Sequence, residues 1–202
     1  NDKRTEVIIS DYRPCELKVT FESFPFAQRY QENEENRLKE TVEVYYQNPS
    51  DKHLIFVGNK KFGNTLDLLL NQQGIRSKFH NADLEHSKRL EIENAFRNGE
   101  LDVLISTSTT AWGVNLPARR LIISSTKFGI ERMPVADVLQ MAGRAGRPKY
   151  DKQGDVTILL DSEEFDREKS RIESGFQVIS TLLDTDVLSF HICAEIVNET
   201  IF

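Results

Sequence analysis

The residues with the clearest chemical potential are two arginines set three positions apart among glycines. They lie in the run Gln140-Met-Ala-Gly-Arg-Ala-Gly-Arg-Pro148, where helical spacing would place Arg144 and Arg147 on one face. Phosphoryl transfer needs fixed positive charge beside the phosphates, which a planar guanidinium supplies through two parallel hydrogen bonds. Gln140, one turn earlier, could orient a water or touch the terminal phosphate. A solvated arginine pair on a surface helix is the plain alternative, but each helical glycine costs about 1 kcal/mol and needs a reason.

A second polar run follows a short apolar stretch that is typical of a strand. It reads Ser106-Thr-Ser-Thr-Thr-Ala-Trp-Gly-Val-Asn-Leu-Pro-Ala118. Hydroxyl groups and free backbone amides at a strand end can bind the phosphates of a nucleic-acid backbone. A loop without a ligand is the alternative, since loops favour serine and threonine in any case.

These two runs resemble motifs of a known family. Gln-x-x-Gly-Arg-x-Gly-Arg is similar to motif VI of superfamily 2 helicases, and the residues up to Gly154 look like the Ski-two-like branch, nearest to archaeal DNA repair helicases and the polymerase-theta helicase domain. The polar run resembles motif V, although Trp112 replaces a residue that is small in that branch. The resemblance covers about residues 8–160. It implies the following site residues: arginine fingers at Arg144 and Arg147 aided by Gln140, nucleotide contacts at Gly113, Asn115 and Gly143, and a strand phosphate contact at Thr109.

Two weaker likenesses add candidate strand contacts. Leu54-Ile-Phe-Val-Gly-Asn-Lys60 resembles motif IV, which implies that Asn59 and Lys60 reach the backbone of one strand. His80-Asn-Ala-Asp-Leu84 resembles the motif that follows, with His80 matching and its neighbours departing from the pattern. His80 is therefore a candidate phosphate contact, and a structural, hydrogen-bonded histidine is an equally good interpretation.

Two other patterns imitate nucleotide and metal sites. Gly58-Asn-Lys-Lys-Phe-Gly-Asn-Thr65 nearly fits a phosphate loop, but Asn64 stands where the loop needs lysine. Asp161 ends an apolar stretch as a magnesium ligand could, yet it is better explained as a helix cap. We therefore predict no metal site in this chain. ATP would be shared with a first RecA-like domain that binds most of the Mg²⁺, and this chain would not hydrolyse ATP alone.

Short apolar strands alternate with helices and would position these residues. We expect strands at 17–24, 53–57, 75–79, 101–106, 120–125 and 155–160, and helices at 34–46, 62–73, 84–97 and 135–142. Such βαβ units build a parallel sheet buried on both faces, here an α/β RecA-like three-layer fold with a mostly parallel sheet. Ligands commonly lie at the carboxyl ends of parallel strands, so we expect both arginines to project from that edge.

Three segments are predicted along the chain. Residues 1–29 are expected to be a connector, because Asp11-Tyr-Arg-Pro14 is similar to the link between the two motor domains of this branch. Residues 30–161 would be the second RecA-like domain. Residues 162–202 form a helical extension, in which His191 to Val197 resembles the start of a winged-helix domain. The chain has no initiator methionine and ends on apolar residues, so we expect it to be part of a longer protein.

The composition is that of an ordinary globular protein: 202 residues, 39% hydrophobic and 29% charged. The net charge is −6, but residues 51–150 contain 15 Lys/Arg against 10 Asp/Glu, and the remainder contains 11 against 22. A basic block within acidic flanks suits nucleic acid, although chance patchiness of surface charge gives the same count. No apolar run is long enough to span a membrane, and two cysteines favour a reducing intracellular compartment.

Taken together, the motifs and the resemblance predict the C-terminal motor domain of a nucleic-acid helicase, and the resemblance implies 3′–5′ movement. Its partners would be the first RecA-like domain of the same protein and single-stranded or forked nucleic acid, with DNA favoured over RNA. Backbone contacts read little sequence, so binding should be sequence-tolerant and salt-sensitive. Two alternatives stay open: a non-catalytic nucleic-acid-binding or scaffold module with a RecA-like fold, and a regulatory domain that binds nucleotide through the 58–65 loop.

Overall fold

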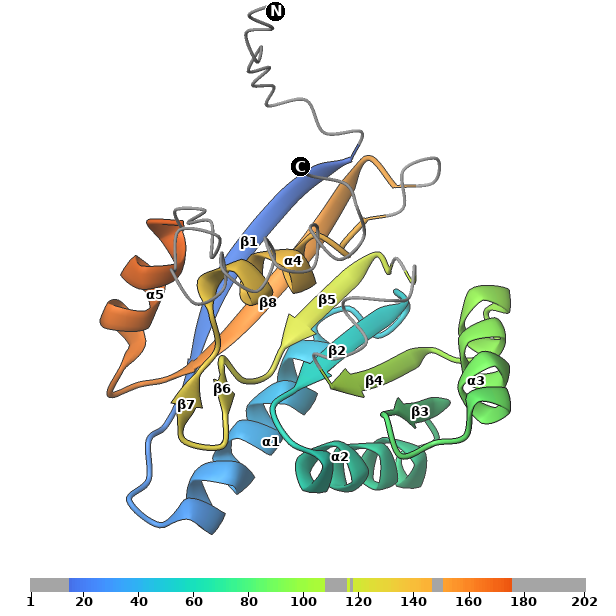
Figure 1. The fold of residues 1–202 in the computed structure, drawn as a ribbon, viewed down its shortest axis with the longest axis horizontal. Helices are drawn as coiled ribbons and strands as arrows, with labels where there is room; N and C mark the ends of the chain where they lie inside the picture. The colour runs from blue at the N-terminus through green and yellow to red at the C-terminus, as the bar shows by residue number, and fades with distance from the viewer. Residues whose placement is uncertain (1–14, 108–115, 117, 147–150, 176–202) are drawn as a thin grey trace, which may run out of the picture.

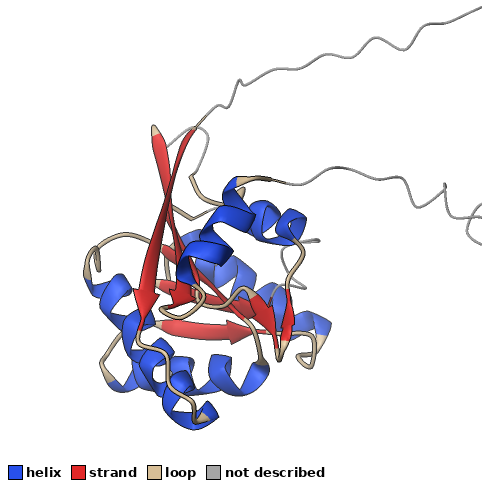
Figure 2. Ribbon diagram, turned by 90° about the vertical axis from the view of Figure 1, so that its left-hand side faces the viewer, coloured by secondary structure: helices blue, strands red, loops and turns tan. Residues whose placement is uncertain are grey.

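The main feature of the fold is a single parallel sheet of six strands in the order β1-β8-β5-β2-β4-β3. The structure is a computed structural model that describes residues 15–107, 116, 118–146 and 151–175. Helices cover both faces of the sheet (Figures 1 and 2), so the predicted three-layer α/β architecture is confirmed. The elements are β1 Glu16–Phe24, α1 Tyr30–Tyr46, β2 His53–Val57, α2 Lys60–Gln72, β3 Ser77–His80, α3 His86–Asn98, β4 Val103–Thr107, β5 Arg120–Ile123, β6 Lys127–Phe128, β7 Glu131–Arg132, α4 Val135–Ala142, β8 Gln153–Asp161 and α5 Phe165–Glu173.

The strands are apolar because their side chains fill two cores, one on each face. In β2, Leu54 and Phe56 pack with residues of α3, α4 and α5, whereas Ile55 and Val57 pack with residues of α1 and α2. Successive side chains of a strand point to opposite faces, so burial of both faces requires an unbroken apolar run. This is why five consecutive residues of β2 are buried.

The direction of the connections reverses between the neighbouring strands β2 and β5. From β2 the chain passes through α2 to one side of the sheet, and from β5 it passes through α4 to the other side and the opposite face. The segments that leave these two strands therefore diverge, and the carboxyl ends of strands at such a point are the usual place for ligands. Where they leave the strands, the two segments are still in contact. A Cβ on Gly58, which follows β2, would lie 2.5 Å from the carbonyl oxygen of Lys127, which follows β5.

Most predicted elements are confirmed, and two have the predicted bounds, β2 and α4. Gly74 and Gly99, which were predicted to close helices, adopt positive φ angles of 79° and 82° just after α2 and α3. Glycine is favoured there because a left-handed residue with a side chain is strained. The small hairpin of β6 and β7 was not predicted, since two-residue strands leave no periodic signal.

The structure corrects two expectations at the ends of the described chain. Residues 16–24, assigned to the connector, form β1, which pairs with β8 along its whole length and buries Phe24 in the core. Helix α5, assigned to the helical extension at 162–202, buries Ile172 against the core shared by the sheet and α4. Both elements cover one edge of the sheet. The predicted winged-helix start at 191–197 lies outside the described residues.

Leu66 and Leu68 give a matched test of the packing of α2. Leu66 is fully buried beneath the sheet, whereas Leu68 on the same helix is 61% exposed. We expect Leu66→Ala to lower the free energy of unfolding by about 2–5 kcal/mol, because the substitution removes apolar contacts and leaves a cavity. Leu68→Ala should change it by less than about 0.5 kcal/mol. Denaturant unfolding of both variants measures the difference, and equal losses would contradict the assignment of this face to the core.

His53 predicts a loss of stability in mild acid. Burial lowers the pKa of this histidine to about 4, although its Nδ1 lies 2.9 Å from the carbonyl oxygen of Asp51. In the unfolded chain the pKa is about 6.5. As the pH falls from about 6.5 to about 4, the unfolded chain therefore takes up a proton that the folded chain does not, and the free energy of unfolding falls by up to about 3 kcal/mol. Urea unfolding at several pH values should show a shallower decline in His53→Gln than in the parent chain.

Candidate functional site

Arg144 lies at the amino edge of the sheet, beside the start of β5. The N–H of Ala118 donates to the carbonyl of Arg144 at 3.4 Å, and the N–H of Gly146 donates to the carbonyl of Ala118 at 2.7 Å. Ala118 precedes β5 by two residues. The expectation that Arg144 projects from the carboxyl edge is therefore wrong. A parallel connection must return the chain to the amino edge, so a residue that follows the crossover helix α4 has to lie there.

The backbone that follows α4, residues 143–146, is held by small residues from three other segments; we call it the α4 turn. Ala118 and Ala145 form a parallel bridge and are both buried. Gly146 has a φ angle of 86°, and a Cβ there would overlap the Sγ of Cys15. A Cβ on Gly154, at the start of β8, would lie 2.5 Å from the carbonyl carbon of Ala145. The main chain at Arg144 thus has little freedom to shift.

Three predicted site residues come together at this turn. Gln140 on α4 and Arg144 are half-buried, and Gly143 is exposed. A half-buried guanidinium beside an exposed glycine backbone fits one side of a nucleotide phosphate group. No described segment near the α4 turn has the form of a phosphate loop.

The other predicted residues of motifs V and VI lie outside the described residues. These are Thr109, Gly113, Asn115 and Arg147, together with Trp112. The ends of motif V are described: Thr107 ends β4 at the carboxyl edge, and Leu116 and Ala118 are buried near the amino edge.

Asn59 and Lys60 lie at the carboxyl edge, where α2 begins. The Oδ1 of Asn59 accepts a hydrogen bond from the N–H of Phe62 at 2.8 Å and caps the helix, and its Nδ2 donates to Glu34 at 3.4 Å. Lys60 forms an ion pair of 2.6 Å with Asp83, and both side chains are largely exposed. Such an exposed pair contributes little stability, so Lys60 could exchange this carboxylate for a phosphate.

His80 does not lie where it could bind a strand. The residue is 1% exposed, and its Nε2 is 3.1 Å from the Oε1 of Glu93 on α3. A side chain enclosed by its own helix and strand cannot reach a phosphate, so of the two interpretations the structural one is supported. The phosphate contact at His80 is withdrawn.

The structure gives the conformation of the two patterns that resemble a phosphate loop and a magnesium ligand, residues 58–65 and Asp161. Strand β2 ends at Val57 and α2 begins at Lys60, so most of the 58–65 run is helix and leaves no room for a phosphate loop. The Oδ1 of Asp161 accepts a hydrogen bond from the N–H of Glu164 at 2.9 Å in the turn before α5. The N-cap residue of α5 is Glu164, so the prediction that Asp161 caps the helix is wrong. Within the described ranges, no group of three or more His, Cys, Asp or Glu residues could hold a metal ion. In the same ranges, no helix is long and apolar enough to cross a membrane.

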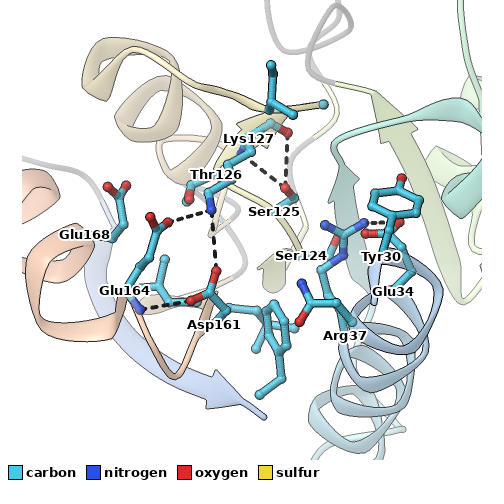
Figure 3. A pocket seen from close by; sticks show the side chains of 16 residues that line it. Tyr30, Glu34, Arg37, Ser124, Ser125, Thr126, Lys127, Asp161, Glu164 and Glu168 are labelled. Carbon is cyan, nitrogen blue, oxygen red and sulfur yellow. Dashed lines mark hydrogen bonds and ion pairs between the residues drawn. The ribbon is translucent and has the colours of Figure 1, made fainter. Parts of the chain in front are cut away.

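An ion-pair network that was not predicted from the sequence ties the β6–β7 hairpin to Glu164 and α5, and Figure 3 shows the contacts of Lys127 within it. Arg132 of β7 contacts Glu168 at 2.7 Å and Glu164 at 2.9 Å, and Lys127 of β6 contacts Glu164 at 2.5 Å. Burial by itself would raise the pKa of Glu164, but hydrogen bonds from Lys127 and Arg132 outweigh it and lower the pKa. The spacing of Glu164 and Glu168, one helical turn apart, was the one signal that could have found it.

Comparison with known proteins gives one family and several partial relatives. Residues 35–149 match the model of the helicase conserved C-terminal domain. Activating signal cointegrator 1 complex subunit 3 from Homo sapiens is 45% identical over 128 residues, which is 60% of this chain and 6% of that protein. The DExH-box ATP-dependent RNA helicase DExH14 from Arabidopsis thaliana is 40% identical over the same shares. The chain therefore spans about 6% of the length of these relatives.

Solved structures share the fold at low sequence identity. The C-terminal domain of the DEAD-box protein Dbp5 superposes with a TM-score of 0.65 and 20% identity, covering 80% of this chain and 84% of that one. A DEAD box protein from Methanococcus jannaschii gives a TM-score of 0.61 and 18% identity, covering 80% of this chain and 40% of that one. These likenesses support the RecA-like arrangement of the sheet and helices.

Substitutions of Gly146 and Gly99 distinguish the stability cost of close packing at the α4 turn from the cost of backbone strain. Both have a positive φ angle, but nothing lies within 4 Å of a Cβ on Gly99. Gly99→Ala should lower the free energy of unfolding by about 1 kcal/mol from left-handed strain alone. Gly146→Ala should cost about 2–4 kcal/mol, because the methyl group also collides with Cys15. Adding Cys15→Ala to Gly146→Ala should restore part of the loss in denaturant unfolding; no recovery would show that the two residues do not touch.

Proposed function

The chain belongs to the helicase conserved C-terminal domain family of superfamily 2 helicases, and from this premise we propose that it is the second RecA-like motor domain of an ATP-dependent helicase. The observation that carries the proposal is the placement of Arg144 on a rigid turn bonded to Ala118, next to the end of motif V. A guanidinium on such a turn keeps its position relative to the sheet. That suits a group that must meet a phosphate held by another domain.

In this proposal ATP lies between the α4 turn and a first RecA-like domain, which supplies the phosphate loop and most of the Mg²⁺ ligands. Arg144 and Arg147 would face the phosphates, with Gln140 orienting a water, and Gly113, Asn115 and Gly143 would present backbone to the nucleotide. Hydrolysis supplies the free energy for opening and closing the two domains. This chain alone would hold one side of the nucleotide and would not turn it over.

The nucleic-acid strand would bind at the opposite, carboxyl edge. Asn59 and Lys60 begin α2 there, and Thr109 belongs to the segment that starts at the end of β4. Lys60 supplies an exposed cation, and Asn59 is fixed by its capping bond and by Glu34. Because the sheet is rigid between its edges, a movement of the α4 turn with the nucleotide would carry these strand contacts with it.

The next part of the proposal concerns whether the bound strand is DNA or RNA. Resemblance to DNA repair helicases favoured DNA with 3′–5′ movement, whereas one relative is named an RNA helicase and one structural neighbour was solved with RNA bound. The described contacts involve backbone-binding residue types, and none of them distinguishes a 2′-hydroxyl. We therefore propose a sequence-tolerant single strand as the substrate, with DNA and RNA compared directly. An intracellular location is consistent with this substrate.

The finger assignment is tested in the full-length protein that contains this chain. We expect Arg147→Ala, and likewise Arg144→Ala, to lower nucleic-acid-stimulated ATP turnover by about 10³-fold or more, because the transition-state charge loses its partner. Binding of a single strand in the absence of nucleotide should change by less than about twofold, since phosphate contacts of the strand lie at the other edge.

Lys60→Ala is the reciprocal control. It should weaken strand binding and its salt dependence while leaving turnover at saturating strand within about twofold, because it removes one phosphate contact. Unchanged turnover in both arginine variants would refute the fingers and favour the non-catalytic binding module. Tight ATP binding by this chain alone would favour a regulatory nucleotide-binding domain instead.

A further inference from the structure

A pocket at the carboxyl edge is not used by the proposed motor contacts. It encloses about 380 Å³ between the start of α1, the end of β5, the β6–β7 hairpin and the start of α5 (Figure 3). Ligand sites usually enclose about 300–1,000 Å³, so this volume suits a small ligand or one group of a larger ligand. We call it the hairpin pocket.

The lining of the hairpin pocket includes buried and exposed apolar groups. Phe24, Leu159 and Leu160 line it and are buried. Tyr30 and Ile130 stand at the rim, and Ile130 at the hairpin tip is 97% exposed. A flat, largely apolar group could therefore be covered on more than one side.

The charges of the pocket disfavour a phosphate. Four carboxylates line it, those of Glu34, Asp161, Glu164 and Glu168, against two cations, Arg37 and Lys127. Both cations are committed: Arg37 pairs with Glu34 at 2.6 Å, and Lys127 pairs with Glu164 at 2.5 Å and Asp161 at 3.4 Å. An anion would meet more carboxylate than unpaired positive charge, so a neutral ligand fits better.

Arg37 brings a buried guanidinium to the α1 wall of the pocket. The residue is 8% exposed, its guanidinium carbon lies 4.4 Å from the ring centre of Phe62, and its Nε has no hydrogen-bond partner among the described residues. A buried donor left unsatisfied costs about 1–3 kcal/mol, so it calls for an acceptor. The opposite wall offers carboxylate oxygens at Asp161 and Glu164 (Figure 3).

The pocket also adjoins the proposed strand contacts. Glu34 accepts hydrogen bonds from Arg37 inside the pocket and from Asn59 at the start of α2. Gly58 packs against Lys127 and Ser125 of the pocket wall so closely that a Cβ would not fit. A strand whose backbone lies on Asn59 and Lys60 would thus pass the mouth of the pocket.

We propose that the hairpin pocket receives one unpaired nucleobase of the bound strand. A base is neutral and flat, and carries acceptors for the Arg37 side and N–H donors for the carboxylate side on one edge. Tyr30 stacks on the base at the rim. The inference rests on the proposed function, because it assumes that the chain binds a strand at this edge.

Two matched variants of α1 and an abasic strand test the pocket in the full-length protein. Short single strands of DNA and of RNA, each carrying one abasic residue at a different position, are titrated in the absence of nucleotide. We expect one position, and only one, at which loss of the base weakens binding by about tenfold, in line with the loss of one stacked base. Tyr30→Ala should weaken binding of the intact strand by a similar factor.

Tyr46→Ala is the control, since Tyr46 is an exposed tyrosine on the same helix outside the pocket. The decisive measurement combines Tyr30→Ala with the abasic strands. At the sensitive position the substitution should weaken binding little further, and at every other position it should weaken binding by its full factor. Equal affinity at every abasic position would overturn the proposal. So would equal behaviour of the two tyrosine variants, which would indicate another occupant, such as a peptide of a partner protein.

Failure of this inference can be told apart from failure of the motor. A full-length protein with strand-stimulated ATP turnover and a flat abasic scan would lose only the base pocket. A protein that neither binds strands nor shows such turnover would lose the proposed function together with it.

Discussion

Every strand of the main sheet runs in the same direction, so each connection has to carry the chain from the carboxyl edge back to the amino edge. This constraint places the candidate functional residues at two opposite edges of the sheet. Residues that follow a strand directly, such as Asn59 and Lys60, lie at the carboxyl edge, and residues that follow the crossover helix α4, such as Arg144, lie at the amino edge. Two sites on one rigid sheet can move together without any bending of the sheet between them.

Close backbone packing holds the α4 turn at the amino edge. Cys15, Ala118, Gly146 and Gly154 bring four chain segments to one place, and two of these contacts exclude even a methyl group. Interiors packed at such density transmit displacement instead of absorbing it. The entry to β1, at Cys15, therefore touches the turn that carries Arg144.

The carboxyl edge is held in a different way. The β6–β7 hairpin has two residues in each strand and depends on ion pairs from Lys127 and Arg132 to Glu164 and Glu168 of α5. Glu168 is almost fully buried, so its pairing with Arg132 and Arg171 is needed to offset the loss of hydration. This arrangement keeps one wall of the hairpin pocket in place while the tip at Ile130 stays exposed.

The sequence by itself determined the layers of the fold and the parallel sheet, because apolar periodicity and glycine positions are local properties that survive in the folded chain. It could not place the motifs relative to one another. Arg144 was expected at the wrong edge, His80 was open between two roles, and β1 was taken for a connector, since each outcome depends on which distant segments pack together. Only the tertiary structure brought Ala118 to Arg144, Glu93 to His80 and β8 to β1, and only it revealed a pocket whose walls come from α1, β5 and α5.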